Sequence, residues 1–325
     1  MNVGDKTARA VFGLTLLGFA GPALSQSYPN KPVRMIVAFA PGGGTDIVGR
    51  IVGQKLAAKW PQPVVIDNRP GAGSTVGTAM TAKAPPDGYT ISMTSMSHAI
   101  NATLYRTLPY DSIRDFEPII LVARAPNVLV VHPSVAAHTV KDLVALAKAR
   151  PGQLNFSSSG TGGVSHLSAE WLNAVARMDM LHVPYKGAGP AMSALLGGEV
   201  QVMMATTPVS LPQIKANRVR GIAISSLLRS PLAPGMPTIA ESGFPGFETD
   251  TWYGMLAPAG TPAAIVRRLN ADTSRALELP DLKAALEQQG AQPAGGSPDE
   301  FRRFIQTETE KWAKAIRVAK VPSAN

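Results

Sequence analysis

Two glycine-rich loops are the parts of this sequence best suited to binding chemistry. The first spans residues 41–46 and the second 157–163, and each lies between an apolar, strand-like run and a helix-like run. A helix that begins directly after glycines presents unpaired backbone N–H groups and the positive end of its dipole. Two such turns that face one another can hold a carboxylate without catalytic machinery. The pattern therefore favours capture of a small anion over its conversion.

Two ionisable side chains lie next to these loops. His166 falls in the first turn of the helix after the second loop, where its ring either contacts the ligand or packs as a helix-capping residue. Asp46 opens the first helix, where it either caps the helix, worth about 0.5–2 kcal/mol, or reaches the ligand through a water or a donor group. The sequence shows no obvious cationic partner for Asp46. No Arg lies within either loop, which favours recognition by neutral amides and water over a guanidinium clamp.

Motifs of the common enzyme classes are missing. Residues 71–77 read G-x-G-x-x-x-G, one residue longer than the dinucleotide-binding fingerprint, so a tight structural turn is the better interpretation. Neither glycine loop is followed by the Lys-Ser/Thr pair of a P-loop, and there is no G-x-S-x-G or H-E-x-x-H motif. The five histidines are dispersed. We predict no catalytic residue, no metal site and no cofactor.

The first 25 residues have the layout of a secretory signal peptide. Lys6 and Arg9 precede an apolar stretch over residues 10–20, followed by small residues up to Ser25. That stretch falls short of the roughly twenty residues needed to span a bilayer.

The chain has no cysteine, which excludes disulfides, a lipoprotein anchor and zinc–cysteine sites. We expect cleavage after Ser25 and release as a soluble, secreted protein.

The charge excess suits small anions better than nucleic acid. The formal net charge is +9, and loss of two cations and one anion with the leader leaves +8. The basic residues are scattered and aromatic residues make up only 6% of the chain, whereas a nucleic-acid surface needs basic runs interleaved with stacking residues. We expect no nucleic-acid partner and a modest attraction of anionic small molecules.

Strand-like and helix-like runs alternate along the mature chain, which predicts parallel sheets with ligands collecting at the carboxyl ends of the strands. The first set has strands at 33–39, 64–67 and 89–94 and helices at 46–60 and 75–84. After apolar runs at 119–122 and 128–131, a second set has helices at 140–149, 164–176 and up to 196, and strands at 154–156, 181–183, 200–204 and 221–224. From Trp252 onward the chain is expected to be helical, with a last helix at 298–319 that packs on the first set.

Five motifs are spread over the mature chain in a fixed order. They are VAFAPGGGTD at 37–46, DNRPGAG at 67–73, PPDGYT at 85–90, HVPYKG at 182–187 and PTIAESG at 237–243. Together they resemble the Bug family, the periplasmic receptors of tripartite tricarboxylate transporters. Each motif is weak alone, but the ordered set is specific and covers essentially the whole mature chain.

The resemblance implies an α/β, type II periplasmic-binding-protein fold, in which two Rossmann-like domains are joined by two crossover segments with a ligand cleft between them. With a signal peptide at 1–25, domain 1 would comprise 26–124 plus 252–325, and domain 2 would comprise 125–251. Such a receptor closes its two domains by a hinge motion around a small carboxylate: an amino acid, a di- or tricarboxylate or an aromatic acid. It would act in the periplasm as a monomer and deliver its ligand to the large and small membrane subunits of a transporter.

The resemblance also implies which residues bind. In that family the two loops hold a carboxylate largely through backbone amides, small hydroxyls and bridging water. The matching residues here are Gly42, Gly43, Gly44, Thr45, Asp46, Ser158, Ser159, Gly160, Thr161, Gly162, Gly163 and His166. Contacts that vary with the ligand are expected at strand ends, at Ser95, Ser97, His98, Tyr185, Thr206 and Thr207. Tyr185 is alternatively a packing residue of its turn, and Phe39 with Trp252 or Tyr253 either lines an apolar wall or fills core.

The sequence thus predicts an extracytoplasmic solute receptor for carboxylates. An enzyme acting on small carboxylic acids is the alternative, and an interaction protein with a degenerate site is a third class. A receptor melts at a higher temperature with its ligand and returns it unchanged, an enzyme yields a product, and the third class responds to no acid.

Overall fold

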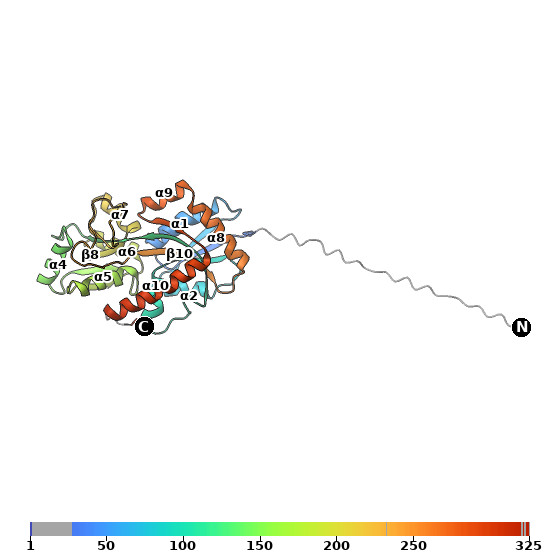
Figure 1. Cartoon of the computed structure of the whole chain (residues 1–325), viewed down its shortest axis with the longest axis horizontal. Helices are drawn as coiled ribbons and strands as arrows, with labels where there is room; N and C mark the ends of the chain where they lie inside the picture. Colours follow the sequence, from blue (N-terminus) through green and yellow to red (C-terminus); the bar gives the residue numbers. More distant parts are fainter. Residues whose placement is uncertain (2–27, 232, 320, 322, 325) are drawn as a thin grey trace.

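The chain forms two α/β units, each built on its own sheet (Figure 1). The structure is a computed structural model that describes residues 1, 28–231, 233–319, 321 and 323–324. The predicted signal peptide at 1–25 lies outside the described residues, apart from Met1.

The first unit contains a six-stranded sheet of order β11-β4-β10-β3-β1-β2. Its strands are β1 (Val33–Val37), β2 (Val64–Asn68), β3 (Thr90–Ser95), β4 (Phe116–Ala125), β10 (Thr251–Pro258) and β11 (Gln292–Gly295). β1 pairs in parallel with β2 and β3, as predicted, whereas β10 is antiparallel to β3 and β4, and β11 is antiparallel to β4. The helix expected from Trp252 onward is wrong at its start, because this fully buried segment is β10. An apolar run buried on all sides fits a strand as well as a helix.

The second unit contains a five-stranded sheet of order β7-β6-β8-β5-β9. Its strands are β5 (Asn127–Val131), β6 (Asn155–Ser158), β7 (Leu181–Pro184), β8 (Val202–Thr206) and β9 (Arg220–Ile224). β6 is parallel to β7 and β8, while β5 is antiparallel to β8 and β9. Both sheets therefore combine a parallel core, where the glycine loops follow strands, with antiparallel additions that the periodicity did not predict.

Helices cover both faces of each sheet. They are α1 (Gly44–Ala57), α2 (Thr75–Ala82), α3 (Ser97–Leu104), α4 (Val140–Ala149), α5 (Val164–Val175), α6 (Ala188–Leu196), α7 (Thr207–Lys215), α8 (Ala263–Leu277), α9 (Pro280–Gln288) and α10 (Pro298–Ala319), with a 3-10 turn, η1 (Ala72–Ser74). Core residues of α1, α8 and α9 pack with the first sheet on one side, and those of α3 and α10 on the other. In the second unit α4 and α5 share one core and α6 and α7 the other. Within the described residues, no helix is long and apolar enough to cross a membrane.

The chain passes twice between the units. The first passage is short, because only Pro126 separates β4 from β5, and the second runs from β9 to β10. The Asn127 backbone N–H donates to the Ser225 hydroxyl at 2.8 Å, and that hydroxyl donates to the Asp250 carboxylate at 3.2 Å. This chain of hydrogen bonds ties the two passages together. The division into domains at 26–124 plus 252–325 and 125–251 stays a prediction.

The last helix contacts both units. Trp312 and Ile316 of α10 share a buried cluster with Leu167 of α5, and Figure 1 shows α10 running along the first unit toward α5. The expectation that this helix packs on the first set of elements is therefore incomplete.

Candidate functional site

The first glycine loop leads from β1 into α1, and its shape depends on two glycines. Gly42 has φ +81°, in the left-handed region that favours glycine. A Cβ on Gly44 would lie 2.3 Å from the Tyr253 hydroxyl and 2.8 Å from Thr206 Oγ1. Glycine at position 44 therefore lets two hydroxyls, one from each unit, approach the first turn of α1.

The Asp46 side chain stabilises the first glycine loop through hydrogen bonds. Its carboxylate accepts hydrogen bonds from the Gly42 N–H at 2.9 Å, from Asn68 Nδ2 at 2.9 Å and from Arg50 Nε at 3.0 Å. Burial alone would raise the pKa of Asp46, but these three donors together lower it below its usual value. Asp46 is thus an ionised, fully partnered carboxylate. It lines neither of the two cavities described below.

The second glycine loop leads from β6 into α5 and is held by side chains beneath it. The hydroxyls of Ser158 and Ser165 accept hydrogen bonds from the backbone N–H groups of Gly160 and Ser159, at 3.1 and 2.8 Å. Gly160 and Gly162 have φ of +122° and +82°. The loop is therefore fixed by local hydrogen bonds and by a backbone conformation that disfavours other residues.

A stacked pair of histidines lies beneath the same loop. The rings of His166 and His182 are 4.0 Å apart at their centroids. His166 Nδ1 accepts from the Gly162 N–H at 3.3 Å, and His182 Nε2 hydrogen-bonds the Ser158 hydroxyl at 2.6 Å. Burial lowers the pKa of His166 to about 3, with a further contribution from His182, and burial lowers the pKa of His182 to about 4. Both rings are neutral near pH 7, and their contacts are those of supports for the loop.

An inner cavity of about 30 Å³ lies where the two loops meet. It is lined by Phe39, Gly43, Gly44, Thr45, Ser95, Ser97, Ser159, Val164, Ala188, Thr206, Thr251 and Tyr253. Three of its hydroxyls, on Thr206, Thr251 and Tyr253, are buried without a well-formed hydrogen bond within the described residues, and the Tyr253 hydroxyl has Thr206 as a close polar neighbour. Burial raises the pKa of Tyr253 far above its usual value, so its phenol stays protonated. Buried polar groups without partners are rare, and here they face a space large enough for a small polar group.

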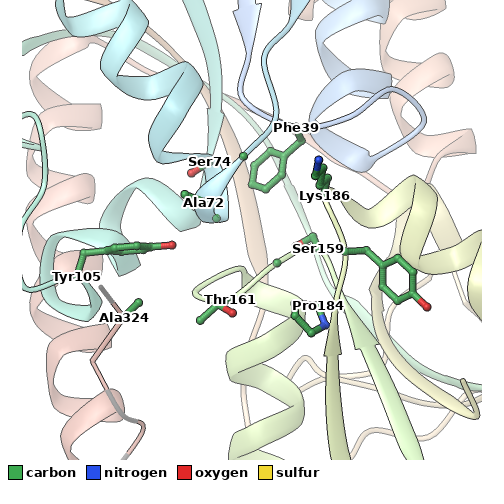
Figure 2. A pocket seen from close by; sticks show the side chains of 13 residues that line it. Phe39, Ala72, Ser74, Tyr105, Ser159, Thr161, Pro184, Lys186 and Ala324 are labelled. Carbon is green, nitrogen blue, oxygen red and sulfur yellow. The ribbon is translucent and has the colours of Figure 1, made fainter.

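An outer cavity of about 440 Å³ adjoins the inner one, and Phe39 and Ser159 line both. Its other lining residues are Gly71, Ala72, Gly73, Ser74, Tyr105, Gly160, Thr161, Pro184, Tyr185, Lys186 and Ala324, most of them shown in Figure 2. This volume is within the range of small-molecule sites. Among the described residues, Lys186 carries the one charged side chain that lines either cavity, and no Asp or Glu lines them.

The structure brings most of the predicted site residues together. Of the sequence candidates, those that line a cavity are Phe39, Gly43, Gly44, Thr45, Ser95, Ser97, Ser159, Gly160, Thr161, Tyr185, Thr206 and Tyr253. Those that line neither are Gly42, Asp46, His98, Ser158, Gly162, Gly163, His166, Thr207 and Trp252. Several residues of the second group support the loops instead. A binding role for the sequence candidates therefore stays a prediction.

Two candidates have other partners. His98 Nε2 hydrogen-bonds the Ser112 carbonyl oxygen at 2.8 Å, and its ring packs edge-on against Phe116. Burial lowers the pKa of His98 to about 4, so it is a neutral core histidine near pH 7. The Thr207 hydroxyl donates to the Gly290 carbonyl oxygen at 2.6 Å.

Sequence reasoning did not select several residues of the outer cavity. The turn at 71–74 was interpreted as structural, yet a Cβ on Gly73 would lie only 2.2 Å from the Thr161 carbonyl oxygen, so this turn touches the second glycine loop. Lys186 directly follows Tyr185, which was selected, and the same strand-end argument would have found it. Tyr105 and Ala324 approach through an isolated bridge between distant segments, for which the sequence carries no signal.

No group of three or more potential metal ligands occurs in the part of the chain that the structure describes.

Known proteins resemble this chain over nearly its whole length. The model of the Tripartite tricarboxylate transporter family receptor matches residues 48–320. Protein BugT of Bordetella pertussis is 38% identical over 312 residues, which cover 95% of this chain and 96% of that protein.

Solved structures give the same result. The structure of R. palustris Rpa4515 with adipate matches with a TM-score of 0.88 and 36% identity, covering 90% of this chain and 98% of that one. The periplasmic binding protein BugD matches with a TM-score of 0.88 and 34% identity, covering 91% and 99%. MatC from Rhodopseudomonas palustris with bound malate matches with a TM-score of 0.86 and 32% identity, covering 89% and 100%. These matches confirm the predicted two-domain, type II periplasmic-binding-protein fold and the resemblance to Bug proteins.

Proposed function

The chain belongs to the tripartite tricarboxylate transporter receptor family, and we propose that it captures a small organic carboxylate between its two glycine loops for delivery to a membrane transporter. A receptor role is what its relatives share, and two of them have structures with carboxylates, adipate and malate. The ligand of this chain and its transporter partner are the parts that we propose.

The observation that carries the proposal is the chemistry of the inner cavity. Its wall combines Gly43 and Gly44 at the start of α1, Ser159 and Val164 beside the start of α5, and the buried hydroxyls of Thr206, Thr251 and Tyr253; no acidic side chain of the described residues lines it. A carboxylate has two oxygens that accept several hydrogen bonds, and it would satisfy donors that otherwise stay buried and unpaired. A cation would find no anionic side chain among the described lining residues.

The two units supply different parts of this wall. Gly43 and Gly44 belong to the first unit, while Ser159 and Thr206 belong to the second. A ligand that contacts both stabilises whichever arrangement brings them together, which is the basis of hinge closure. We propose that the units move as the domains predicted above, about the passages at Pro126 and near Asp250, and that the large and small membrane subunits recognise the closed form. Export to the periplasm and a monomeric state are part of this proposal.

Native mass spectrometry of freshly purified mature protein, followed by thermal melting with a panel of organic acids, tests the proposal. We expect a retained or added carboxylate of small mass, a higher melting temperature with that acid, and an unchanged acid after prolonged incubation. Conversion of the acid into a product would favour the enzyme alternative. Stabilisation by a sugar or a metal ion, with no response to any acid, would refute carboxylate capture.

A further inference from the structure

The two cavities differ in volume and in charge. This difference indicates which chemical group a ligand carries at the end away from its first carboxylate. The inner cavity has hydroxyls and backbone groups but no charged side chain, and its volume suits one carboxylate group. The outer cavity is more than ten times larger in volume, at about 440 Å³ against about 30 Å³, and contains Lys186. A ligand whose carboxylate occupies the inner cavity must place the rest of its atoms in the outer one.

Lys186 is fixed to the site through its backbone. Its carbonyl oxygen accepts a hydrogen bond from the Ala40 N–H at 3.2 Å, which joins the segment before α6 to the first glycine loop. The next residue, Gly187, has φ +149°, and a Cβ there would lie 3.0 Å from the Ala40 nitrogen. The close approach of these two backbones keeps Lys186 beside Phe39, as Figure 2 shows.

The ammonium group of Lys186 is available to a ligand. Its side chain is exposed, and no ion pair joins it to an acidic group among the described residues. The acidic residue bonded to a neighbouring lining side chain is Glu199, which accepts from the Tyr185 hydroxyl at 3.4 Å. Within the part of the chain that the structure describes, the cavity lining therefore presents one positive side chain and no negative one.

The connection between the cavities is apolar on one side. Phe39 lines both and is a buried residue, 7% exposed. A ligand that extends from one cavity to the other must pass this ring, where methylene groups are favourable and a charge is not. The order of chemistry along the path is therefore hydroxyls and amides, then an aromatic wall, then an ammonium group.

We infer that Lys186 holds the second anionic group of a dianionic ligand, so that the site selects dicarboxylates with an apolar spacer over monocarboxylates of equal length. The inference rests on the proposed capture of one carboxylate in the inner cavity. A charge-assisted hydrogen bond from an ammonium group to a carboxylate, partly shielded by the cavity wall, gives a preference of about tenfold.

Isothermal titration with pairs of acids of equal carbon number tests the inference. The probes are succinate, glutarate and adipate against butyrate, pentanoate and hexanoate at pH 7, where all are ionised. They are titrated into the wild type, Lys186→Met, Lys186→Arg and the control Lys141→Met. Lys141 is an exposed lysine of α4 that lines neither cavity, so its variant has the same loss of net charge.

We expect the wild type and Lys141→Met to prefer at least one diacid over its monoacid by about tenfold or more. Lys186→Met should lose that preference by weakening diacid binding while monoacid binding stays within about twofold or tightens, and Lys186→Arg should keep part of it. Equal weakening of diacid and monoacid would mean that Lys186 only raises the local potential, and a wild type that prefers the monoacids would mean an apolar outer subsite. Either result overturns the inference but leaves carboxylate capture intact. Binding of no acid at all would refute both.

Discussion

The Asp46 carboxylate accepts the backbone N–H of Gly42, four residues earlier, at 2.9 Å. The same carboxylate pairs with Arg50, one turn further along α1. The cationic partner that the sequence did not make obvious is therefore present, at the i, i+4 spacing that places two residues on one helix face. Asp46 faces away from the cavities and fixes the loop in front of it. Its negative charge is paired locally with Arg50, so it repels a bound anion less than an unpaired carboxylate would.

Asp46→Ala should weaken carboxylate binding, while Asp46→Asn should be milder. Alanine leaves the Gly42 N–H without its acceptor and removes one of the two hydrogen bonds of the Asn68 amide, which still donates to the Phe39 carbonyl oxygen. Loss of such partly buried hydrogen bonds costs about 1–3 kcal/mol. Asparagine keeps one oxygen that can accept from Gly42. Titration calorimetry of the bound acid and thermal melting measure the two effects. If Asp46→Ala lost stability but kept its affinity for the acid, the loop would keep its binding shape without the Asp46 hydrogen bonds.

Gly44→Ala should abolish binding. The added methyl group would lie 2.3 Å from the Tyr253 hydroxyl and enter the inner cavity. Gly49→Ala is a matched control on the same helix, because its Cβ would meet Met93 and Val37 at an ordinary 3.5 Å. Alanine is favoured over glycine inside helices by about 1 kcal/mol, so the control should keep its affinity and its melting temperature. Equal affinity in both variants would place the ligand elsewhere.

Tyr253→Phe should weaken binding by about tenfold and change the stability of the free protein little, because the deleted hydroxyl has no well-formed hydrogen bond in the described residues and loses only its contact with Thr206. Tyr110→Phe is the control. Its hydroxyl is also buried without a well-formed hydrogen bond, with Asn101 and Thr78 as polar neighbours, and Tyr110 packs against Phe116 and lines neither cavity. Calorimetry and urea unfolding of both variants compare the two sites. A Tyr253→Phe variant with wild-type affinity would show that this hydroxyl does not contact the ligand.

The sequence predicted the positions of both glycine loops because local rules determine them: a strand, glycines with special backbone angles, and then a helix. It was less reliable for single side chains near the loops. Ser97 and His98 both follow β3 and were selected together, but they begin α3, where successive residues point about 100° apart. Ser97 consequently lines the inner cavity, while His98 points into the core.

Longer-range features were less predictable still. The antiparallel neighbours β4 and β10 are more than a hundred residues apart in the chain, so pairing between them leaves no local pattern. The same holds for the contact between the 71–74 turn and the second glycine loop. Such features depend on which apolar faces meet in the folded protein, and a single sequence does not record that.

Asp250→Asn should stabilise the protein at pH 7–8, and the gain should disappear as the pH falls toward 4. Burial raises the pKa of Asp250 from 3.8 to about 6, opposed by the Ser225 hydroxyl; Glu248 raises it further, while Lys311 and Arg124 lower it. The folded state thus binds the proton more tightly than the unfolded state. The ionised carboxylate therefore costs stability above about pH 6, and this cost is absent below about pH 4.

A shift of this size corresponds to a cost on the order of 2–3 kcal/mol. Urea unfolding of the wild type, Asp250→Asn and the exposed control Asp179→Asn between pH 4 and 8 measures it. We expect the difference in unfolding free energy between Asp250→Asn and the wild type to grow with pH, and the control to stay parallel to the wild type. A difference that does not change with pH would contradict the prediction. Asp250 is bonded through Ser225 to Asn127, so a confirmed cost would mean that the protein keeps a destabilising charge at the junction of its two chain passages.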